Sequence, residues 1–137
     1  MKKLFIYIDG ASKGNPGKAG YGFLIYDEKK NLVEKSGGFL GITTNNVAEY
    51  FALIFSLISA IKYNPESVIV YSDSQLMVKQ INGEYKVKQE WIKRLYAVSK
   101  SLIGNFKKIS IVYIPREENK EADNLANSVI EKQNSLF

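Results

Sequence analysis

Four acidic residues lie next to runs of apolar residues, where solvated charges are uncommon. They are Asp9, Glu49, Asp73 and Asp123. Each has an ordinary explanation on its own, as an acid in a turn, at a helix N-terminus or at the border of a helix face. If they converge, desolvation and mutual repulsion would cost several kcal/mol each unless cations bind between them. Two Mg²⁺ ions, or Mn²⁺ in their place, would balance the four carboxylates and are suited to hard oxygen ligands.

Two such ions about 4 Å apart can catalyse phosphoryl transfer, one activating a water molecule and the other stabilising the leaving oxygen. The chain contains no His and no Cys, which excludes disulfides, Cys–His zinc sites, thiol nucleophiles, Ser-His-Asp triads and histidine acid–base catalysis. Its 19 basic residues exceed its 14 acidic residues. This balance favours a polyanionic partner, although a solvated lysine-rich surface has the same composition.

Apolar runs separated by turn residues predict the elements that would position the acids. In the first part of the chain, strands are expected over residues 4–8, 21–26 and 32–40. A Gly- and Asn-rich loop over residues 11–20 and a polar turn over residues 27–31 would join them. Three strands in succession predict an antiparallel meander.

Helices and strands alternate in the rest of the chain. The nearly continuous apolar run over residues 47–61 predicts a central helix, with Thr43, Thr44 and Asn45 as candidate N-caps. The further elements expected are a parallel strand over residues 68–71, helices over 75–81 and 88–103, a strand over 109–114 and a last helix from about residue 117. The helix over 88–103 has an apolar stripe of Trp91, Leu95, Val98 and Leu102, and the last helix one of Ala122, Leu125, Ala126, Val129 and Ile130.

This order, βββαβααβα, indicates an α/β fold with a five-stranded mixed sheet in a single domain over residues 1–137. Asp9 and Asp73 each follow a strand that should be central and parallel. Because sites in such sheets form at the carboxyl ends of the strands, the two acids are expected to meet there. Glu49, in the first turn of the covering helix, would lean over the same edge, which predicts the metal site.

Four motifs in this order resemble the type 1 ribonucleases H, which cut the RNA strand of RNA–DNA hybrids. The motifs, spread over about residues 5–126, are Asp9-Gly10-Ala11-Ser12 with the glycines that follow, Thr43-Thr44-Asn45-Asn46 with Ala48-Glu49, Ser72-Asp73-Ser74-Gln75, and Asn119 with Ala122-Asp123. The resemblance implies the sheet described above, flanked by helices. It also implies that Asp9, Glu49, Asp73 and Asp123 are the ligands of two Mg²⁺ ions.

The resemblance further assigns residues to the nucleic acid. Contacts with the minor groove, where the RNA 2′-OH groups lie, would come from Gly10, Ala11, Ser12, Asn15, Asn45 and Gln75. Thr44 and Asn46 would lie near backbone phosphates, and Asn119 belongs to the same substrate-contacting set. For Asn45 and Asn46, helix capping is an equally good explanation.

Two departures from the family pattern stand out. The histidine usual before the last helix is missing, and Arg116 is the candidate for its place. Because arginine stays protonated, Arg116 could act on a phosphate only electrostatically, and a solvated surface arginine is the alternative. The basic helix and handle loop of some members is also absent. Tyr85, with neighbouring lysines, could supply a reduced contact to the DNA strand, and Trp91 fits either this channel or the core of its helix.

The missing handle leads to a testable expectation. Hybrid binding should be weaker and more salt-sensitive than in handle-bearing relatives. The dissociation constant measured at several salt concentrations checks this. A constant that barely changes between low and moderate salt would contradict it.

The function expected from the sequence is metal-dependent endonucleolytic hydrolysis of RNA in a hybrid, leaving 5′-phosphate and 3′-hydroxyl ends. The alternatives are a non-catalytic hybrid-binding module on the same fold and a related nuclease that cuts double-stranded RNA or a DNA junction. No signal peptide or membrane-spanning segment is evident, since the first apolar run soon meets Asp9. A cytoplasmic protein is therefore expected, and a monomer is expected as well.

Overall fold

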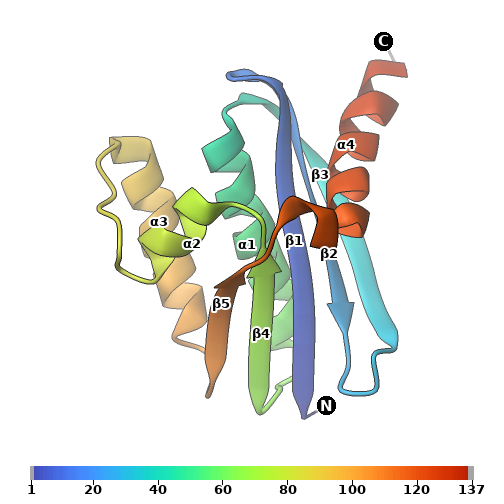
Figure 1. The fold of residues 1–137 in the computed structure, drawn as a ribbon, viewed down its shortest axis with the longest axis vertical. Helices are drawn as coiled ribbons and strands as arrows, with labels where there is room; N and C mark the ends of the chain where they lie inside the picture. Colours follow the sequence, from blue (N-terminus) through green and yellow to red (C-terminus); the bar gives the residue numbers. More distant parts are fainter. Residues whose placement is uncertain (1, 136–137) are drawn as a thin grey trace.

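The chain forms one five-stranded sheet in the spatial order β3-β2-β1-β4-β5 (Figure 1). The computed structural model describes residues 2–135, and the side chains of residues 2–133. The strands are β1 (Lys3–Gly14), β2 (Gly17–Tyr26), β3 (Leu32–Thr43), β4 (Ser67–Ser72) and β5 (Ile109–Tyr113). β1, β2 and β3 pair antiparallel, whereas β4 runs parallel to both β1 and β5. The expected mixed sheet, with three antiparallel strands followed by parallel ones, is confirmed.

Helices cover both faces of this sheet. They are α1 (Asn45–Ile61), α2 (Gln75–Ile81), α3 (Glu90–Ile103), the short 3₁₀ helix η1 (Arg116–Glu118) and α4 (Lys120–Ser135). α1 packs on one face, where Tyr50, Leu53 and Leu57 are fully buried in the main core. α4 lies on the other face, against β1, β2 and β3 (Figure 1). No helix in the described part of the chain is long and apolar enough to cross a membrane.

The segment over residues 11–20 is a β-hairpin, so the predicted loop is wrong. β1 continues to Gly14, whose positive φ of 106° begins the tight turn, and β2 already starts at Gly17. Most of the glycines nearby serve close packing. A Cβ on Gly10 would lie 2.3 Å from the Ala48 carbonyl carbon in α1, and one on Gly22 would lie 2.8 Å from the Leu125 side chain in α4. The glycines that predict a turn are therefore needed here because α1 and α4 pack close to the sheet.

Three other expectations need correction. The last helix does not begin at residue 117, because η1 ends at Glu118 and α4 starts only at Lys120. Glu49 lies beyond the first turn of α1, which contains no acidic residue. In α3, the buried residues are Ile92, Leu95 and Ser99, whereas Trp91 is 54% exposed and Val98 is 47% exposed. The predicted stripe is confirmed at Leu95, which is buried, and at Leu102, which packs partly buried against the core. It is wrong at Trp91 and Val98, where Ile92 and Ser99 are buried instead.

Candidate active site

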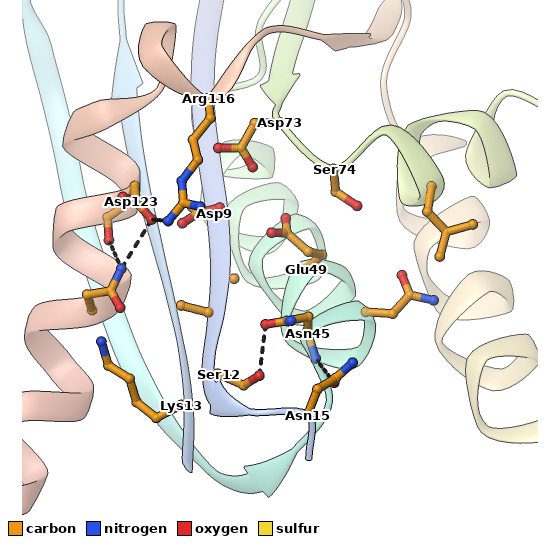
Figure 2. A pocket seen from close by; sticks show the side chains of 15 residues that line it. Asp9, Ser12, Lys13, Asn15, Asn45, Glu49, Asp73, Ser74, Arg116 and Asp123 are labelled. Carbon is orange, nitrogen blue, oxygen red and sulfur yellow. Dashed lines mark hydrogen bonds and ion pairs between the residues drawn. The ribbon is translucent and has the colours of Figure 1, made fainter. Parts of the chain in front are cut away.

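Three of the four acids converge at the point where β1 and β4 stop pairing. The last paired residues are Ile8 and Ser72, so the next residue on each strand is Asp9 or Asp73. Ser74 caps α2 by accepting a hydrogen bond from the Met77 N–H at 3.2 Å, which leaves the Asp73 carboxylate available. Figure 2 shows Asp73 and Asp9 beside Glu49.

Glu49 reaches this point because Gly10 lets α1 approach β1 closely. The closest backbone atoms to a Cβ built on Gly10 belong to Ala48 and Glu49. One carboxylate oxygen from each of Asp9, Glu49 and Asp73 lies within 4.8 Å of the other two. The convergence of these three acids therefore depends on one glycine and one strand register.

Two acids of this cluster, Asp9 and Glu49, are buried and poorly compensated by protein groups, and Asp73 is half-buried. Asp9 is 4% exposed and Glu49 is 6% exposed. Burial first, and then the negative charges of Glu49 and Asp73, raise the pKa of Asp9 well above its usual range. Burial also raises the pKa of Glu49, whose Oε2 has no hydrogen-bond partner among the described residues. An unpaired buried oxygen among three carboxylates fits a hard divalent cation such as Mg²⁺ or Mn²⁺.

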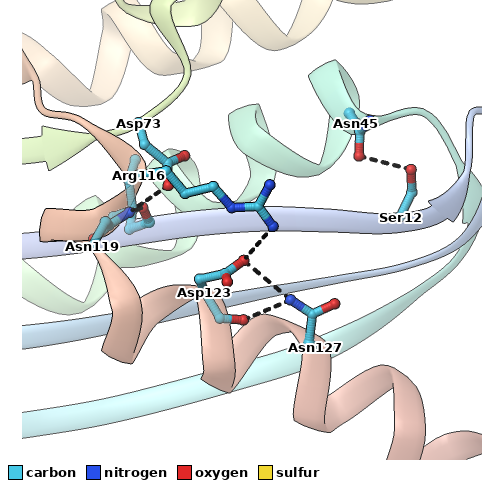
Figure 3. A network of polar contacts seen from close by, with 8 residues as sticks. Ser12, Asn45, Asp73, Arg116, Asn119, Asp123 and Asn127 are labelled. Carbon is cyan, nitrogen blue, oxygen red and sulfur yellow. Dashed lines mark hydrogen bonds and ion pairs between the residues drawn. The ribbon is translucent and has the colours of Figure 1, made fainter.

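Asp123 approaches the cluster from α4, on the other side of β1. A hydrogen bond between the Asp9 and Asp123 side chains contributes to the raised pKa of Asp9. Asp123 Oδ1 lies 3.6 Å from Arg116 Nη2 and accepts a hydrogen bond from Asn127 Nδ2 at 3.1 Å (Figure 3). Asn127 Nδ2 also donates to the Asp123 backbone carbonyl at 2.9 Å. Arg116 and Asn127 therefore hold the same oxygen of Asp123.

Asn119 connects the start of α4 to the strands. Its side chain is buried, and Nδ2 donates to the Ile8 carbonyl at 2.8 Å and to Asp73 Oδ2 at 3.4 Å (Figure 3). The Asn119 carbonyl also accepts the Asp123 N–H at 3.1 Å, at the first turn of α4. Asn119 therefore fixes the position of Asp73 and the start of the helix that carries Asp123.

Polar groups from the β1–β2 hairpin and the start of α1 lie beside the acids. Ser12 Oγ donates to Asn45 Oδ1 at 2.8 Å, and the Asn45 N–H donates to Asn15 Oδ1 at 3.0 Å. These groups and the acids line one depression of about 560 Å³ (Figure 2). The predicted site residues that line it are Asp9, Gly10, Ala11, Ser12, Asn15, Asn45, Asn46, Glu49, Asp73, Arg116 and Asp123.

The other predicted contact residues lie outside this depression. Thr44 Oγ1 accepts the Val47 N–H at 3.3 Å and so caps α1, and Gln75 is exposed at the start of α2. Tyr85 lines a separate hollow near α3, where the Lys79 ammonium lies 4.9 Å from its ring centroid. The exposed ring of Trp91 has the Arg94 guanidinium 5.9 Å from its centroid. Trp91 is therefore excluded from the core, and both aromatic side chains lie beside cations.

Four residues of the depression escaped the sequence reasoning. They are Lys13, Ser74, Leu76 and Asn127. Asn127 could have been found from its spacing, because a residue four positions after Asp123 lies on the same face of a helix. The sequence predicts a loop where the hairpin carries Lys13, and nothing in the local sequence distinguishes Leu76 from an ordinary helix residue.

Asn127 offers a direct test of how Asp123 is oriented. Replacing Asn127 by Ala removes the hydrogen bonds to Asp123, and we expect affinity for Mn²⁺ to fall about 10-fold or more, as is typical for groups that orient metal ligands. Calorimetric titration with Mn²⁺ measures this affinity. Asn124→Ala is the matched control, because Asn124 is an exposed residue of the same helix. Equal affinities for the two variants would contradict the proposed role.

Comparison with known proteins finds similarity along nearly the whole chain. A family model described as reverse transcriptase-like matches residues 7–129. The bifunctional protein Rv2228c of Mycobacterium tuberculosis is 38% identical over 130 residues, which cover 94% of this chain and 36% of that protein. Ribonuclease HI of Halobacterium salinarum is 35% identical over 129 residues, which cover 94% of this chain and 65% of the relative. The chain thus spans about a third of the first relative and slightly less than two thirds of the second.

Solved structures share the fold closely. The N-terminal RNase H domain of Rv2228c matches with a TM-score of 0.94 and 37% identity, covering 100% of both chains. RNase H1 of Halobacterium salinarum matches with a TM-score of 0.91 and 35% identity, covering 95% of this chain and 98% of the other. LC11-RNase H1, solved in complex with an RNA/DNA hybrid, has a TM-score of 0.90 and 41% identity, with the same coverage.

Proposed function

The chain belongs to the type 1 ribonuclease H family, and from this premise we propose that it hydrolyses the RNA strand of RNA–DNA hybrids. The observation that carries the proposal is the convergence of Asp9, Glu49 and Asp73 within 4.8 Å. A module that only bound nucleic acid would gain nothing from buried carboxylates, which repel phosphates. The hybrid bound to LC11-RNase H1 further supports this substrate.

We propose that Asp9, Glu49, Asp73 and Asp123 hold two Mg²⁺ ions, with Mn²⁺ as a substitute. Bound there, the two ions would supply activation of the attacking water and stabilisation of the leaving oxygen. The protein keeps the carboxylates converged through the Gly10 contact with α1 and the hydrogen bonds of Asn119 and Asn127. Cleavage by this route leaves a 5′-phosphate and a 3′-hydroxyl.

Recognition of the RNA strand is assigned to the polar groups beside the acids. Ser12, Asn15 and Asn45 offer hydroxyl and amide groups that both donate and accept hydrogen bonds, as the 2′-OH of RNA also does. Thr44 and Asn46 are proposed to lie near backbone phosphates of the hybrid, and Gln75 is proposed to contact its minor groove. Tyr85 and Trp91, each beside a cation, are proposed to contact the DNA strand. Residues 1–137 would act together as one ribonuclease H domain.

Arg116 is proposed to stabilise the phosphate under attack or the departing phosphate. Its side chain is 76% exposed and lies 3.6 Å from Asp123 Oδ1, so its guanidinium can reach an anion bound beside the acids. We expect Arg116→Ala to lower kcat by about 10-fold, because a partly exposed cation stabilises the transition state less than a buried hydrogen-bond donor does. Steady-state kinetics on a labelled hybrid measures this change.

Two further measurements separate this role of Arg116 from a structural one. Calorimetry of Arg116→Ala should still show Mn²⁺ binding, and Arg116→Lys should recover part of kcat, because lysine keeps the charge and loses the planar guanidinium. An unchanged kcat in Arg116→Ala would contradict the assignment. A loss of metal binding would instead assign Arg116 to holding Asp123.

The nature of the products tests the proposed reaction. A hybrid with labelled RNA, cut in the presence of Mg²⁺, should give fragments whose 5′ ends carry phosphate and whose 3′ ends can be extended by a polymerase. Cyclic 2′,3′-phosphate ends would overturn the proposal, because they indicate attack by the RNA 2′-OH instead of water. Double-stranded RNA of the same sequence is the second substrate: an equal rate on it would indicate the broader nuclease. Binding without cleavage would indicate a binding module.

A further inference from the structure

A second hollow lies on the face of the sheet that carries α4, outside the acid-lined depression. It encloses about 620 Å³ between β1, β2, β4 and residues 117–122. None of the residues that line it also lines the acid-lined depression. α4 packs against β1, β2 and β3, and this face continues over β5, where Val112 is 38% exposed. The hollow therefore lies on an open part of the sheet.

The floor of this hollow is aromatic. Tyr7 and Tyr71 are direct neighbours in the β1–β4 register, with ring centroids 4.8 Å apart and stacked. Tyr26 meets Tyr7 edge to face, with centroids 5.8 Å apart. Phe5 lines the same floor, and the Lys3 ammonium already lies 5.1 Å from its ring centroid. The faces of such rings carry partial negative charge and attract cations.

Acidic side chains form the rim. Glu117, Glu118 and Glu121 line the hollow, together with Lys30 and Lys120. Tyr26 OH donates to Glu121 Oε2 at 3.1 Å. Burial first, and then Tyr71 and the charge of Glu118, raise the pKa of Tyr7. Among the described residues, neither Glu117 nor Glu118 takes part in an ion pair. Three carboxylates and two ammonium groups therefore line the hollow, which makes it net negative in a chain with a net charge of +5.

Asn119 adds a buried acceptor that lacks a donor. It lines this hollow and is 2% exposed, and its Oδ1 has no hydrogen-bond partner in the part of the chain that the structure describes. The amide nitrogen of the same side chain is already bonded to Ile8 and Asp73. Carboxylates, an amide oxygen and ring faces are all acceptors, so the complementary ligand is a cation that carries several N–H donors.

We propose that this hollow binds an arginine side chain presented by a segment of a partner protein. A guanidinium is planar, stacks on tyrosine rings and carries five N–H donors for the carboxylates and the amide oxygen. A volume of about 620 Å³ leaves room for the residues beside that arginine, since pockets of this size hold ligands larger than one side chain. Nucleic acid is a poor occupant, because its phosphates would face the glutamates. The hollow would thus recruit a basic protein while hybrid is cleaved elsewhere on the surface.

Nuclear magnetic resonance titration of the full chain tests this proposal, with Mg²⁺ present to compete at the catalytic acids. The probe is the peptide acetyl-Gly-Arg-Gly-Arg-Gly-amide. We expect amide shifts centred on Tyr7, Tyr71 and Glu118. Glu118→Lys should weaken binding at least about 10-fold, equivalent to about 1.4 kcal/mol, and Tyr71→Ser should weaken it similarly. The lysine version of the peptide should bind more weakly, and raised salt should weaken both.

The controls make each outcome decisive. Glu28→Lys makes the same charge change in the exposed β2–β3 turn and should leave peptide affinity unchanged. Glu118 is also exposed, so its variant should fold even if Tyr71→Ser does not. Glu118→Lys, and Tyr71→Ser if it folds, should cleave hybrid at the wild-type rate. Equal affinity for Glu118→Lys and Glu28→Lys, equal binding of the Glu version of the peptide, or shifts confined to the acid-lined depression would each overturn the proposal.

Discussion

Asp9→Asn is expected to abolish cleavage of the hybrid, with a fall in kcat of about 10³-fold or more, while the metal-free protein becomes more stable. The carboxylate is 4% exposed and faces Glu49 and Asp73, so the variant loses one ligand of the proposed metal site. The same change removes a buried charge that the protein itself does not neutralise. Kinetics on a labelled hybrid and thermal unfolding in a chelator measure the two effects.

The pH dependence of stability follows from the same geometry. Burial and neighbouring charges raise the pKa of Asp9 in the folded state, so the folded metal-free protein retains a proton that the unfolded chain releases above about pH 4. Stability from this group is therefore present below that pH and is lost as the pH rises toward neutrality and beyond. Asn does not ionise, so at neutral pH the variant should be about 1 kcal/mol more stable than the metal-free wild type.

The control for this prediction is Glu28→Gln, which neutralises an exposed acid in the β2–β3 turn. It should leave both kcat and metal-free stability nearly unchanged. Added Mg²⁺ should raise the unfolding temperature of the wild type and of Glu28→Gln, and should raise that of Asp9→Asn much less. An Asp9→Asn variant with wild-type turnover would contradict the assignment of Asp9 to catalysis.

Gly10→Ala is expected to destabilise the protein by about 3 kcal/mol or more and to reduce cleavage at the same time. A Cβ there would lie 2.3 Å from the Ala48 carbonyl carbon and 2.4 Å from the Glu49 nitrogen. Both atoms belong to helix backbone, so the clash is removed only if α1 moves away from β1. We therefore expect a destabilisation at the high end of the range for overpacked cores. That movement separates Asp9 from Glu49. Chemical denaturation gives the stability change, and hybrid cleavage below the melting temperature gives the activity.

Gly104→Ala serves as the matched control for this substitution. At Gly104 the nearest atom to a Cβ is 3.4 Å away, and its φ of −63° is accessible to alanine. Its stability should change by no more than about 0.5 kcal/mol. If Gly10→Ala were as stable and as active as Gly104→Ala, the close approach of β1 and α1 could not be what brings the acids together.

Most of the fold could be predicted from the sequence, because apolar runs mark the strands and helices and capping residues mark the helix starts. The order of strands and helices is confirmed, and the parallel pairing of β1 with β4 brings Asp9 and Asp73 together as expected. The hairpin over residues 11–20 could not be predicted correctly, because glycine serves both turns and close packing. Only the position of α1 and α4 in three dimensions distinguishes Gly10 and Gly22 from turn residues.

Details of the site also depend on long-range contacts. Asn119 lies between η1 and α4 and separates the two helices. Its side chain donates to the carbonyl of Ile8, which is 111 positions earlier in the sequence. No local pattern reveals such a contact. In α3 the cause of the wrong prediction is local, because the buried position falls on Ser99 and not on Val98. Ser99 is polar, and its hydroxyl donates to the Leu95 carbonyl at 2.8 Å, so the pattern of apolar residues alone does not mark it as buried.

The central claim is that this acid cluster hydrolyses RNA in a hybrid and requires a divalent cation. The most direct measurement uses one hybrid with different fluorophores on its RNA and DNA strands, incubated with the wild-type protein in Mg²⁺ or in a chelator. We expect only the RNA label to move to shorter fragments, and only in Mg²⁺. Cleavage of RNA in the chelator, or equal shortening of both strands, would contradict it.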